Sequence, residues 1–227
     1  MRKPPKVRLK DSGSVWQRIP PRLLPGTLPL PEEFVTAARL ARRVLDLGCG
    51  VGSALGELAT EPFANWVGVD INPRAIALAN KQAAANAEFL VHDARRPFPN
   101  IGTFDLFLLK GVLTCLPTHQ EQLQVLRHAT AHATERRVFA IVDFLQNWEH
   151  PRYRRRYELG LRAGWEKGTF LASDRAASLP TYLAHHFEYH ELFRLLDAVG
   201  LRLVCSRDIT VRTRSGNETQ GFVLIAA

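Results

Sequence analysis

Three glycines that alternate with other residues follow a short apolar segment, 44–47, and leave the backbone open to a ligand. Gly48, Gly50 and Gly52 have no side chain, so a ligand can approach their main-chain atoms closely, and torsion angles forbidden to other residues are accessible. Asp70 ends the next apolar segment, and a carboxylate there can accept hydrogen bonds from both hydroxyls of a ribose. This spacing predicts a site for a cofactor that contains adenosine.

The spacing of the glycines excludes a dinucleotide cofactor. A dinucleotide-binding turn has the form Gly-x-Gly-x-x-Gly, in which the third glycine lets the helix pack closely on the strand. Ser53 occupies the position where that third glycine would stand. The turn therefore does not need to bind a pyrophosphate group.

The segment Asp46-x-Gly-x-Gly-x-Gly52 resembles the first motif of the class I S-adenosylmethionine-dependent methyltransferases. Asp93 and Ala94 follow a third apolar run, where this family usually has an Asp that receives the adenine amino group. Segment 104–113 resembles the family's fourth strand and its exit loop, which lies beside the methyl group. Elements in this order and at this spacing are far more specific than a glycine run alone, and the resemblance covers about residues 40–145.

The resemblance implies that S-adenosyl-L-methionine is the cofactor. It places the glycine turn against the amino-acid part of the cofactor and Asp70 on its ribose. Two residues have an alternative role, because Asp70 also fits a helix N-cap and Lys110 also fits an exposed position. The expected cofactor-binding residues are Asp46, Gly48, Cys49, Gly50, Gly52, Asp70, Ile71, Asp93, Ala94 and Lys110.

Four side chains are candidates for the transfer step itself. His185 and His186 precede a predicted helix, and histidine can accept a proton at physiological pH. Tyr182 belongs to the same segment, and Asp143 ends the predicted fifth strand, where it could orient a substrate amine. Alternatives stay open, since in much of the family that the sequence resembles the histidine at this place is structural, and Asp143 also fits an N-cap.

The cysteines and apolar runs limit the class of protein. Cys49, Cys115 and Cys205 have no paired spacing, which argues against a disulfide framework and a zinc site and favours a reducing cytoplasm. The histidines near residue 185 lack a carboxylate or thiolate at a convincing spacing, so no metal site is predicted. No signal peptide is recognised, and no apolar run reaches the roughly 20 residues that span a bilayer.

The net charge of +8 leaves two interpretations of the partner open. Basic residues gather in 2–10 and 152–156, and such clusters occur in nucleic-acid sites, in sites for anionic substrates and on solvated surfaces. We expect methyl transfer to O or N of a small-molecule acceptor. The alternatives are an RNA methyltransferase, acting on tRNA or rRNA, and a catalytically silent cofactor-binding protein. The acceptor, the atom methylated and the choice between monomer and homodimer are left open.

Alternating strands and helices predict an α/β fold with a doubly wound, mostly parallel sheet. The family resemblance implies a Rossmann-like sheet of seven strands with an antiparallel strand from a C-terminal hairpin. Expected strands are 43–47, 66–70, 88–91, 104–109, 137–143, 201–211 and 221–227. Expected helices are 31–41, 52–61, 73–85, 119–133 and 187–199.

Two segments fall outside this alternation. Residues 1–30 are rich in proline, which makes a long helix unlikely, and we expect an arm packed on a methyltransferase domain of residues 31–227. Residues 144–186 carry aromatic side chains with arginines between them. An irregular stretch of this length inside a domain is typical of a lid or substrate-binding insert, in which about 150–163 is expected to be helical.

Overall fold

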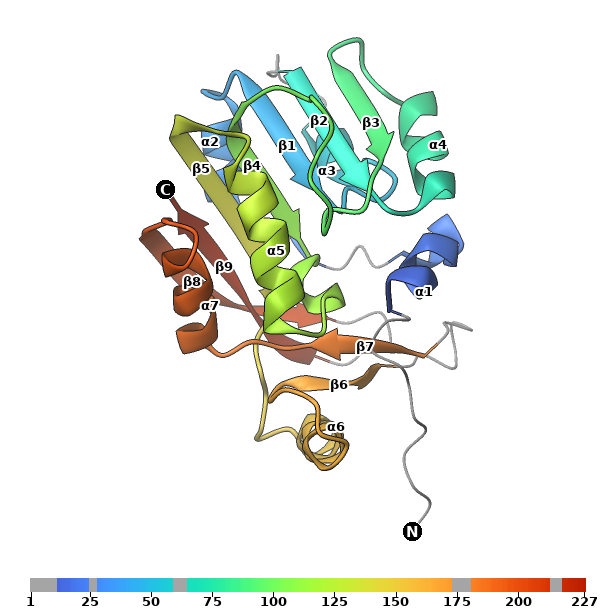
Figure 1. Cartoon of the computed structure of the whole chain (residues 1–227), viewed down its shortest axis with the longest axis vertical. Helices are drawn as coiled ribbons and strands as arrows, with labels where there is room; N and C mark the ends of the chain where they lie inside the picture. Colours follow the sequence, from blue (N-terminus) through green and yellow to red (C-terminus); the bar gives the residue numbers. More distant parts are fainter. Residues whose placement is uncertain (1–11, 25–27, 59–64, 173–180, 213–217) are drawn as a thin grey trace.

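A sheet of seven strands forms the centre of the molecule (Figure 1). The computed structural model describes residues 12–24, 28–58, 65–172, 181–212 and 218–227. In the order β3-β2-β1-β4-β5-β9-β8, the strands from β3 to β5 are parallel, and β9 is antiparallel to both of its neighbours. The strands are β1 (Arg43–Leu47), β2 (Asn65–Asp70), β3 (Ala87–Val91), β4 (Phe104–Lys110), β5 (Ala133–Phe144), β8 (Leu203–Arg212) and β9 (Glu218–Ala226). The predicted Rossmann-like sheet is confirmed.

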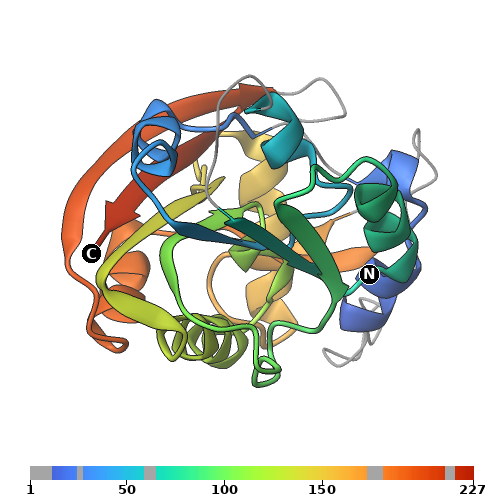
Figure 2. The same ribbon diagram turned by 90° about the horizontal axis from the view of Figure 1, so that it is seen from above.

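Helices cover both faces of this sheet (Figure 2). One face packs against α5 (His119–Thr130) and α7 (Tyr189–Asp197). The other packs against α2 (Glu32–Ala38), α3 (Ser53–Glu57) and α4 (Pro73–Lys81). The sheet is therefore buried on both sides, which explains why its central strands are apolar almost throughout instead of alternating with polar residues.

The fourth strand shows how the sequence places side chains on both faces. Phe107 and Leu109 of β4 belong to the core under α5 and α7, whereas Leu106 and Leu108 point to the core under the other three helices. All four are almost fully buried. Because successive side chains of a strand point to opposite faces, this strand must be apolar at each of the consecutive positions 106–109.

Several helices end earlier than the sequence predicts. Helix α4 ends at Lys81 rather than 85, and the main-chain N–H of Gln82 then bonds to Ala79 in a tighter turn. Helix α7 begins only at Tyr189, because a reciprocal capping box between Glu188 and Glu191 fixes its start. Most of the expected polar turn between the last two strands lies outside the described residues.

The segment 144–186 contains one helix and a separate two-stranded sheet. Helix α6 (Pro151–Arg162) agrees with the expected helical part. The hairpin of β6 (Thr169–Ala172) and β7 (Tyr182–His185) was not expected from the sequence. Figure 1 shows the hairpin and α6 below the carboxyl ends of the parallel strands.

The N-terminal segment packs beside the same end of the sheet. It contains a short helix, α1 (Ser12–Arg18), and a 3₁₀ turn, η2 (Pro21–Leu23). The buried side chain of Asn72 connects this segment to the domain, because its Nδ2 donates to the carbonyls of Trp16 at 3.0 Å and Ile19 at 2.8 Å. Its Oδ1 accepts from the first N–H groups of α4. One amide thus caps a helix and holds α1 in place.

No helix in the described ranges is long and apolar enough to cross a membrane.

Substitution Asn72→Asp should release α1 while leaving the cap of α4 in place. Aspartate still accepts from the helix, but it has no N–H for the carbonyls of Trp16 and Ile19, and two hydrogen bonds of about 0.5–1.5 kcal/mol each are lost. We expect trypsin to cleave after Arg18 and Arg22 faster than in the native protein, as measured by mass spectrometry of the early fragments.

The matched control is Asn80→Asp. Asn80 also donates and accepts through its amide, but both of its partners are main-chain groups of Phe89. This control should lower stability without speeding cleavage after Arg18. Equal cleavage in the two variants would contradict the role assigned to Asn72.

Candidate active site

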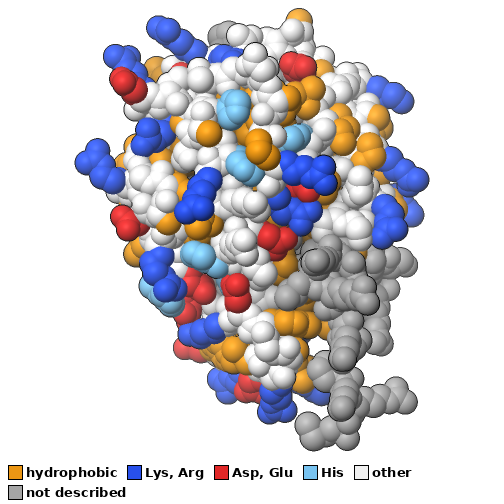
Figure 3. Space-filling model, viewed as in Figure 1, with side chains coloured by type: hydrophobic (Ala, Val, Ile, Leu, Met, Phe, Trp, Pro, Cys, Tyr) orange, Lys and Arg blue, Asp and Glu red, His pale blue; other side chains and the backbone are white. Residues whose placement is uncertain are grey.

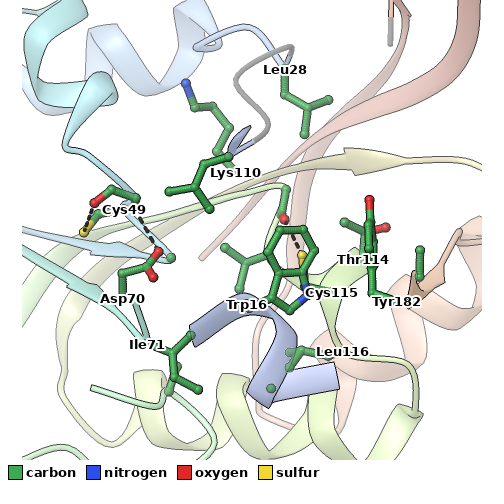
Figure 4. A pocket seen from close by; sticks show the side chains of 18 of the residues that line it. Trp16, Leu28, Cys49, Asp70, Ile71, Lys110, Thr114, Cys115, Leu116 and Tyr182 are labelled. Atoms are coloured by element: carbon green, nitrogen blue, oxygen red, sulfur yellow. Dashed lines mark hydrogen bonds between the residues drawn. The ribbon is translucent and has the colours of Figure 1, made fainter. Parts of the chain in front are cut away.

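A cavity of about 410 Å³ lies where the strand order reverses between β1 and β4. The carboxyl ends of parallel strands on either side of such a reversal leave a crevice that ligands occupy. The loops after β1, β2, β3 and β4 line one end of it, and α1, α6 and the β6–β7 hairpin line the other. Figure 4 shows Trp16 of α1 between Asp70 on one side and Tyr182 on the other.

The glycine turn after β1 exposes its backbone to this cavity. Gly50 has a φ of +56°, a conformation that other residues rarely adopt. A Cβ added to Gly50 would have only one neighbour within 4 Å, the side chain of Leu24 at 3.6 Å, so the space beside this glycine is open. Gly52 does not line the cavity, and its Cβ would lie 2.9 Å from the Phe89 ring. Gly50 therefore leaves room for a ligand, whereas Gly52 allows the helix to pack.

Asp70 joins the tip of β2 to the glycine turn. Its Oδ2 accepts from the N–H of Gly50 at 2.9 Å and its Oδ1 from the N–H of Asn72 at 2.8 Å. Burial raises the pKa of Asp70 above its ordinary value, and the two N–H groups oppose that shift. A carboxylate has about four acceptor positions, so two remain for hydroxyl groups of a ligand in the cavity.

Asp46 supplies a second carboxylate to the same end of the cavity. It is 2% exposed, and its Oδ2 has no hydrogen-bond partner among the described residues. Burial raises its pKa to about 8, although the positive charge of Lys110 acts in the opposite direction. An unpartnered buried oxygen is costly, so a ligand that brings a cationic donor to Asp46 would be bound favourably.

Asp93 lines the cavity, but its carboxylate is already engaged. Arg95 donates to Oδ1 through Nε at 2.9 Å and to Oδ2 through Nη2 at 2.8 Å, and its Nη1 also contacts Glu121 at 2.9 Å. Although burial raises it, these bonds bring the pKa of Asp93 below its ordinary value. Little acceptor capacity is left on Asp93 for an adenine amino group, and the binding role expected from the sequence stays a prediction.

The other expected cofactor residues also lie at this end. Ile71, Ala94 and Gly48 line the cavity, and Lys110 lines it while its Nζ contacts Glu57 at 3.2 Å. Cys49 is 6% exposed, and burial raises the pKa of its thiol well above the ordinary value. Its side chain is therefore a packing group in the turn and not a reactive thiolate.

The opposite end of the cavity is mainly aromatic. Tyr182 from β7 and Trp16 from α1 meet edge to face with ring centroids 4.7 Å apart. Tyr153 from α6, Phe170 from β6 and His186 also line this end. These rings come from segments that are distant in sequence, so the aromatic end exists only when α1, α6 and the hairpin pack together.

His186 is held in a defined protonation state. The hydroxyl of Tyr157 lies 2.8 Å from its Nδ1, and the N–H of Asn147 donates to that same hydroxyl at 3.3 Å. In either tautomer Nδ1 is engaged with this hydroxyl, and a neutral ring has one N–H donor and one acceptor nitrogen. Burial lowers the pKa of His186 to about 3. The ring of His186 is thus neutral at neutral pH, and the role of proton acceptor expected from the sequence stays a prediction.

The other two catalytic candidates do not line the cavity. His185 Nδ1 lies 2.8 Å from the hydroxyl of Thr169, its partner across the β6–β7 hairpin, and this hydroxyl donates to the carbonyl of Pro117 in the loop after β4, so Thr169 connects the hairpin to that loop. Asp143 is fully buried, and its carboxylate accepts from the N–H groups of Thr114 at 3.0 Å and Phe144 at 2.9 Å. Asp143 thereby fixes the turn that forms the cavity wall, and its expected role in orienting a substrate amine stays a prediction.

Sequence reasoning missed several lining residues. Arg95 and Thr114 lie in loops without a recognisable motif. Tyr153 and Arg156 belong to the aromatic and arginine-rich insert, but only the i, i+3 geometry of the folded helix places both on one face.

Comparisons with known proteins agree with this site. Residues 40–160 match the family described as a methyltransferase domain. A SAM-dependent methyltransferase from Methanosarcina mazei has a crystal structure that is 30% identical, with a TM-score of 0.79, over 88% of this chain and 98% of that chain. No curated protein matches the chain.

Two further structures share the fold at lower identity. Magnesium protoporphyrin IX methyltransferase from Synechocystis PCC 6803, solved with S-adenosylhomocysteine, is 21% identical, with a TM-score of 0.54, over 81% of this chain and 72% of that chain. N-methyltransferase NodS from Bradyrhizobium japonicum WM9, also solved with S-adenosylhomocysteine, is 15% identical, with a TM-score of 0.53, over 82% and 77% of the two chains.

The fold and the site define an α/β enzyme that binds its cofactor at the carboxyl ends of parallel strands. Because residues 40–160 match the methyltransferase domain and a SAM-dependent methyltransferase is 30% identical, the chain belongs to the S-adenosylmethionine-dependent methyltransferases. S-adenosyl-L-methionine is its cofactor. The residues present fit this group, because the unpartnered buried Oδ2 of Asp46 is suited to the ammonium of the methionine part. When bound, the cofactor supplies an electrophilic methyl group on a positively charged sulfur.

Substitution Asp70→Ala should weaken binding of S-adenosylhomocysteine at least about tenfold. One or two hydrogen bonds to a charged group are lost, each worth roughly 1.5–3 kcal/mol. Isothermal titration calorimetry measures the affinity directly.

The matched control is Asp105→Ala. Asp105 accepts from the N–H groups of Arg42 and Arg43, both at 2.8 Å, and so also bonds two main-chain amides, but it lies at the amino end of β4, at the opposite edge of the sheet from the cavity. This control should lose stability and keep its affinity. An unchanged affinity in Asp70→Ala would contradict the assigned site.

Proposed function

We propose that this enzyme transfers a methyl group to an O or N atom of a small-molecule acceptor bound at the aromatic end of the cavity. The observation that carries the proposal is the continuity of one cavity from the glycine turn to Tyr182 and His186. Its volume of about 410 Å³ lies within the range of small-molecule sites. Methyl transfer requires that the acceptor lies in line with the reacting carbon and that water is excluded. Walls formed by α1, α6 and the β6–β7 hairpin would position the acceptor and exclude water.

The residues at each end have separate roles in this proposal. Asp70 accepts from the ribose hydroxyls, and Asp46 faces the methionine ammonium. At the other end, His186 donates from Nε2 to an oxygen or nitrogen of the acceptor and orients it. The rings of Trp16 and Tyr182 cover the acceptor, and aromatic faces also stabilise positive charge near the reacting centre.

The charges on the one face shown in Figure 3 favour a small acceptor over RNA. On the face shown in Figure 3, Lys and Arg side chains are dispersed among acidic and apolar groups and form no continuous basic patch. Nucleic-acid sites are typically a basic stripe or patch. We further propose a cytoplasmic location, since Cys49, Cys115 and Cys205 are all free thiols.

The acceptor class can be tested with the purified protein and labelled S-adenosylmethionine. A small-molecule extract should accept the label, and total tRNA and rRNA should not. Labelling of RNA that falls steeply with salt would contradict the proposal and favour nucleic acid. Failure to label any pool while S-adenosylhomocysteine binds would favour a catalytically silent protein.

Substitutions at His186 test its role as a donor. His186→Gln keeps an N–H group, whereas His186→Phe removes it, so the phenylalanine variant should raise the acceptor KM about tenfold more than the glutamine variant. The KM for S-adenosylmethionine should stay unchanged in both. Steady-state kinetics with the identified acceptor measure these values.

The neighbouring histidine is the matched control. His185→Gln disturbs the contact with Thr169 and should lower the melting temperature without a selective effect on the acceptor KM. A bell-shaped pH profile that loses one limb only in His186→Phe would contradict the donor role and indicate a base.

A further inference from the structure

Two arginines of α6 line the aromatic end of the cavity. Arg152 and Arg156 are four residues apart, so their side chains lie on the same face of the helix as Tyr153. Arg152 is exposed and Arg156 is half-buried. The guanidinium carbon of Arg156 lies 5.5 Å from the centroid of the Phe170 ring and 5.8 Å from that of Tyr153. The aromatic walls therefore hold one positive charge in place at the edge of the cavity.

These charges differ from the other cations of the same cavity. Lys110 contacts Glu57, and Arg95 contacts both Asp93 and Glu121. Within the described ranges, neither Arg152 nor Arg156 forms an ion pair with a carboxylate.

The surroundings of Arg156 disfavour its charge. Burial is the main cause that lowers its pKa, and the neighbouring charge of Arg152 adds to it. The described groups that favour the charge electrostatically are the tyrosines 153, 157 and 182. Like charges at i, i+4 destabilise a helix, and a half-buried charge without a counter-charge is costly. Among the described residues Arg156 thus has aromatic contacts and no carboxylate partner, an arrangement that an anionic ligand would complete.

We propose that the methyl acceptor carries an anionic group, a carboxylate or a phosphate, which Arg152 and Arg156 bind while its flat apolar body lies between the aromatic walls. This inference rests on the proposed function and specifies its substrate class. A guanidinium donates two parallel N–H bonds that match the oxygens of either group. Asp70, at the other end of the cavity, accepts hydrogen bonds and offers such an anion no positive charge, which fixes the orientation of the acceptor.

Matched probes test the recognition of the charge. Calorimetry with the full chain saturated with S-adenosylhomocysteine compares 2-naphthoate with 2-naphthamide, and 2-naphthyl phosphate with 2-naphthol. Each pair differs in the anionic group, so at least one anion should bind about tenfold or more tightly than its neutral partner. The two pairs distinguish a carboxylate from a phosphate. Equal binding within both pairs, or no binding of either anion at millimolar concentration, would overturn the inference.

Variants of α6 assign the preference to named side chains. Arg156→Gln should abolish the preference for the anion, Arg152→Gln should reduce it, and both should keep the native affinity for S-adenosylhomocysteine. Arg155→Gln is the control, because Arg155 belongs to the same helix, is exposed and does not line the cavity. A preference that survives in Arg156→Gln would overturn the inference.

Thermal stability separates ligand binding from a structural role. If Arg156 serves a ligand, Arg156→Gln melts at the same or a higher temperature than the native protein. A lower melting temperature together with an unchanged preference for the anion would assign Arg156 to the fold. Displacement of the anionic probes by tRNA, with no preference within either pair, would assign the arginines to nucleic acid.

These measurements also distinguish the proposed anionic acceptor from the proposed methyl transfer. Binding of S-adenosylhomocysteine without a preference for anions contradicts the substrate class and leaves methyl transfer standing. Preference for the anions without binding of S-adenosylhomocysteine contradicts methyl transfer and leaves the arginine site standing.

Discussion

The hydrogen bonds of the Asp70 carboxylate connect the parts on which the site depends. One oxygen accepts from the N–H of Gly50 in the glycine turn, and the other accepts from the N–H of Asn72. Asn72 in turn caps α4 and holds the carbonyls of Trp16 and Ile19. A single carboxylate at the tip of β2 thus links the cofactor end of the cavity to the helix that covers it. Half of its acceptor capacity stays available to a ligand.

Electrostatics divide the cavity into two ends. The carboxylates of Asp46 and Asp70 lie beside the glycine turn, where burial raises the pKa of both. Arg152 and Arg156 lie at the aromatic end. A cofactor with a cationic methionine part would meet the acceptor oxygens of these two acids, and an acceptor with an anionic group would meet the two guanidinium groups. The same division disfavours the reversed orientation of either molecule.

The sequence predicted the sheet well, and most of the residues it assigned to the cofactor line one cavity, because both depend on local patterns. Strands buried on both faces must be apolar throughout, and a turn without Cβ atoms needs glycine. The aromatic end could not be predicted in the same way. Its walls come from α1, α6 and a hairpin with strands of four residues, and no local signal states that Trp16 meets Tyr182.

The catalytic candidates show the same limit at the level of single residues. His185 and His186 are adjacent and chemically identical, yet one bonds Thr169 behind the cavity wall and the other lines the cavity. The Nδ1 of His186 is engaged by Tyr157, a residue 29 positions away in sequence. Asp143 ends a strand at the expected edge, but main-chain N–H groups occupy its carboxylate. Tertiary contacts decide these roles.

The most direct measurement is a crystal structure of the protein with S-adenosylhomocysteine. The account predicts both ribose hydroxyls within hydrogen-bond distance of the Asp70 carboxylate, the ammonium group beside Asp46, and the sulfur directed toward Tyr182 and His186. A ligand bound away from the glycine turn, or a sulfur that faces solvent instead of the aromatic walls, would contradict it.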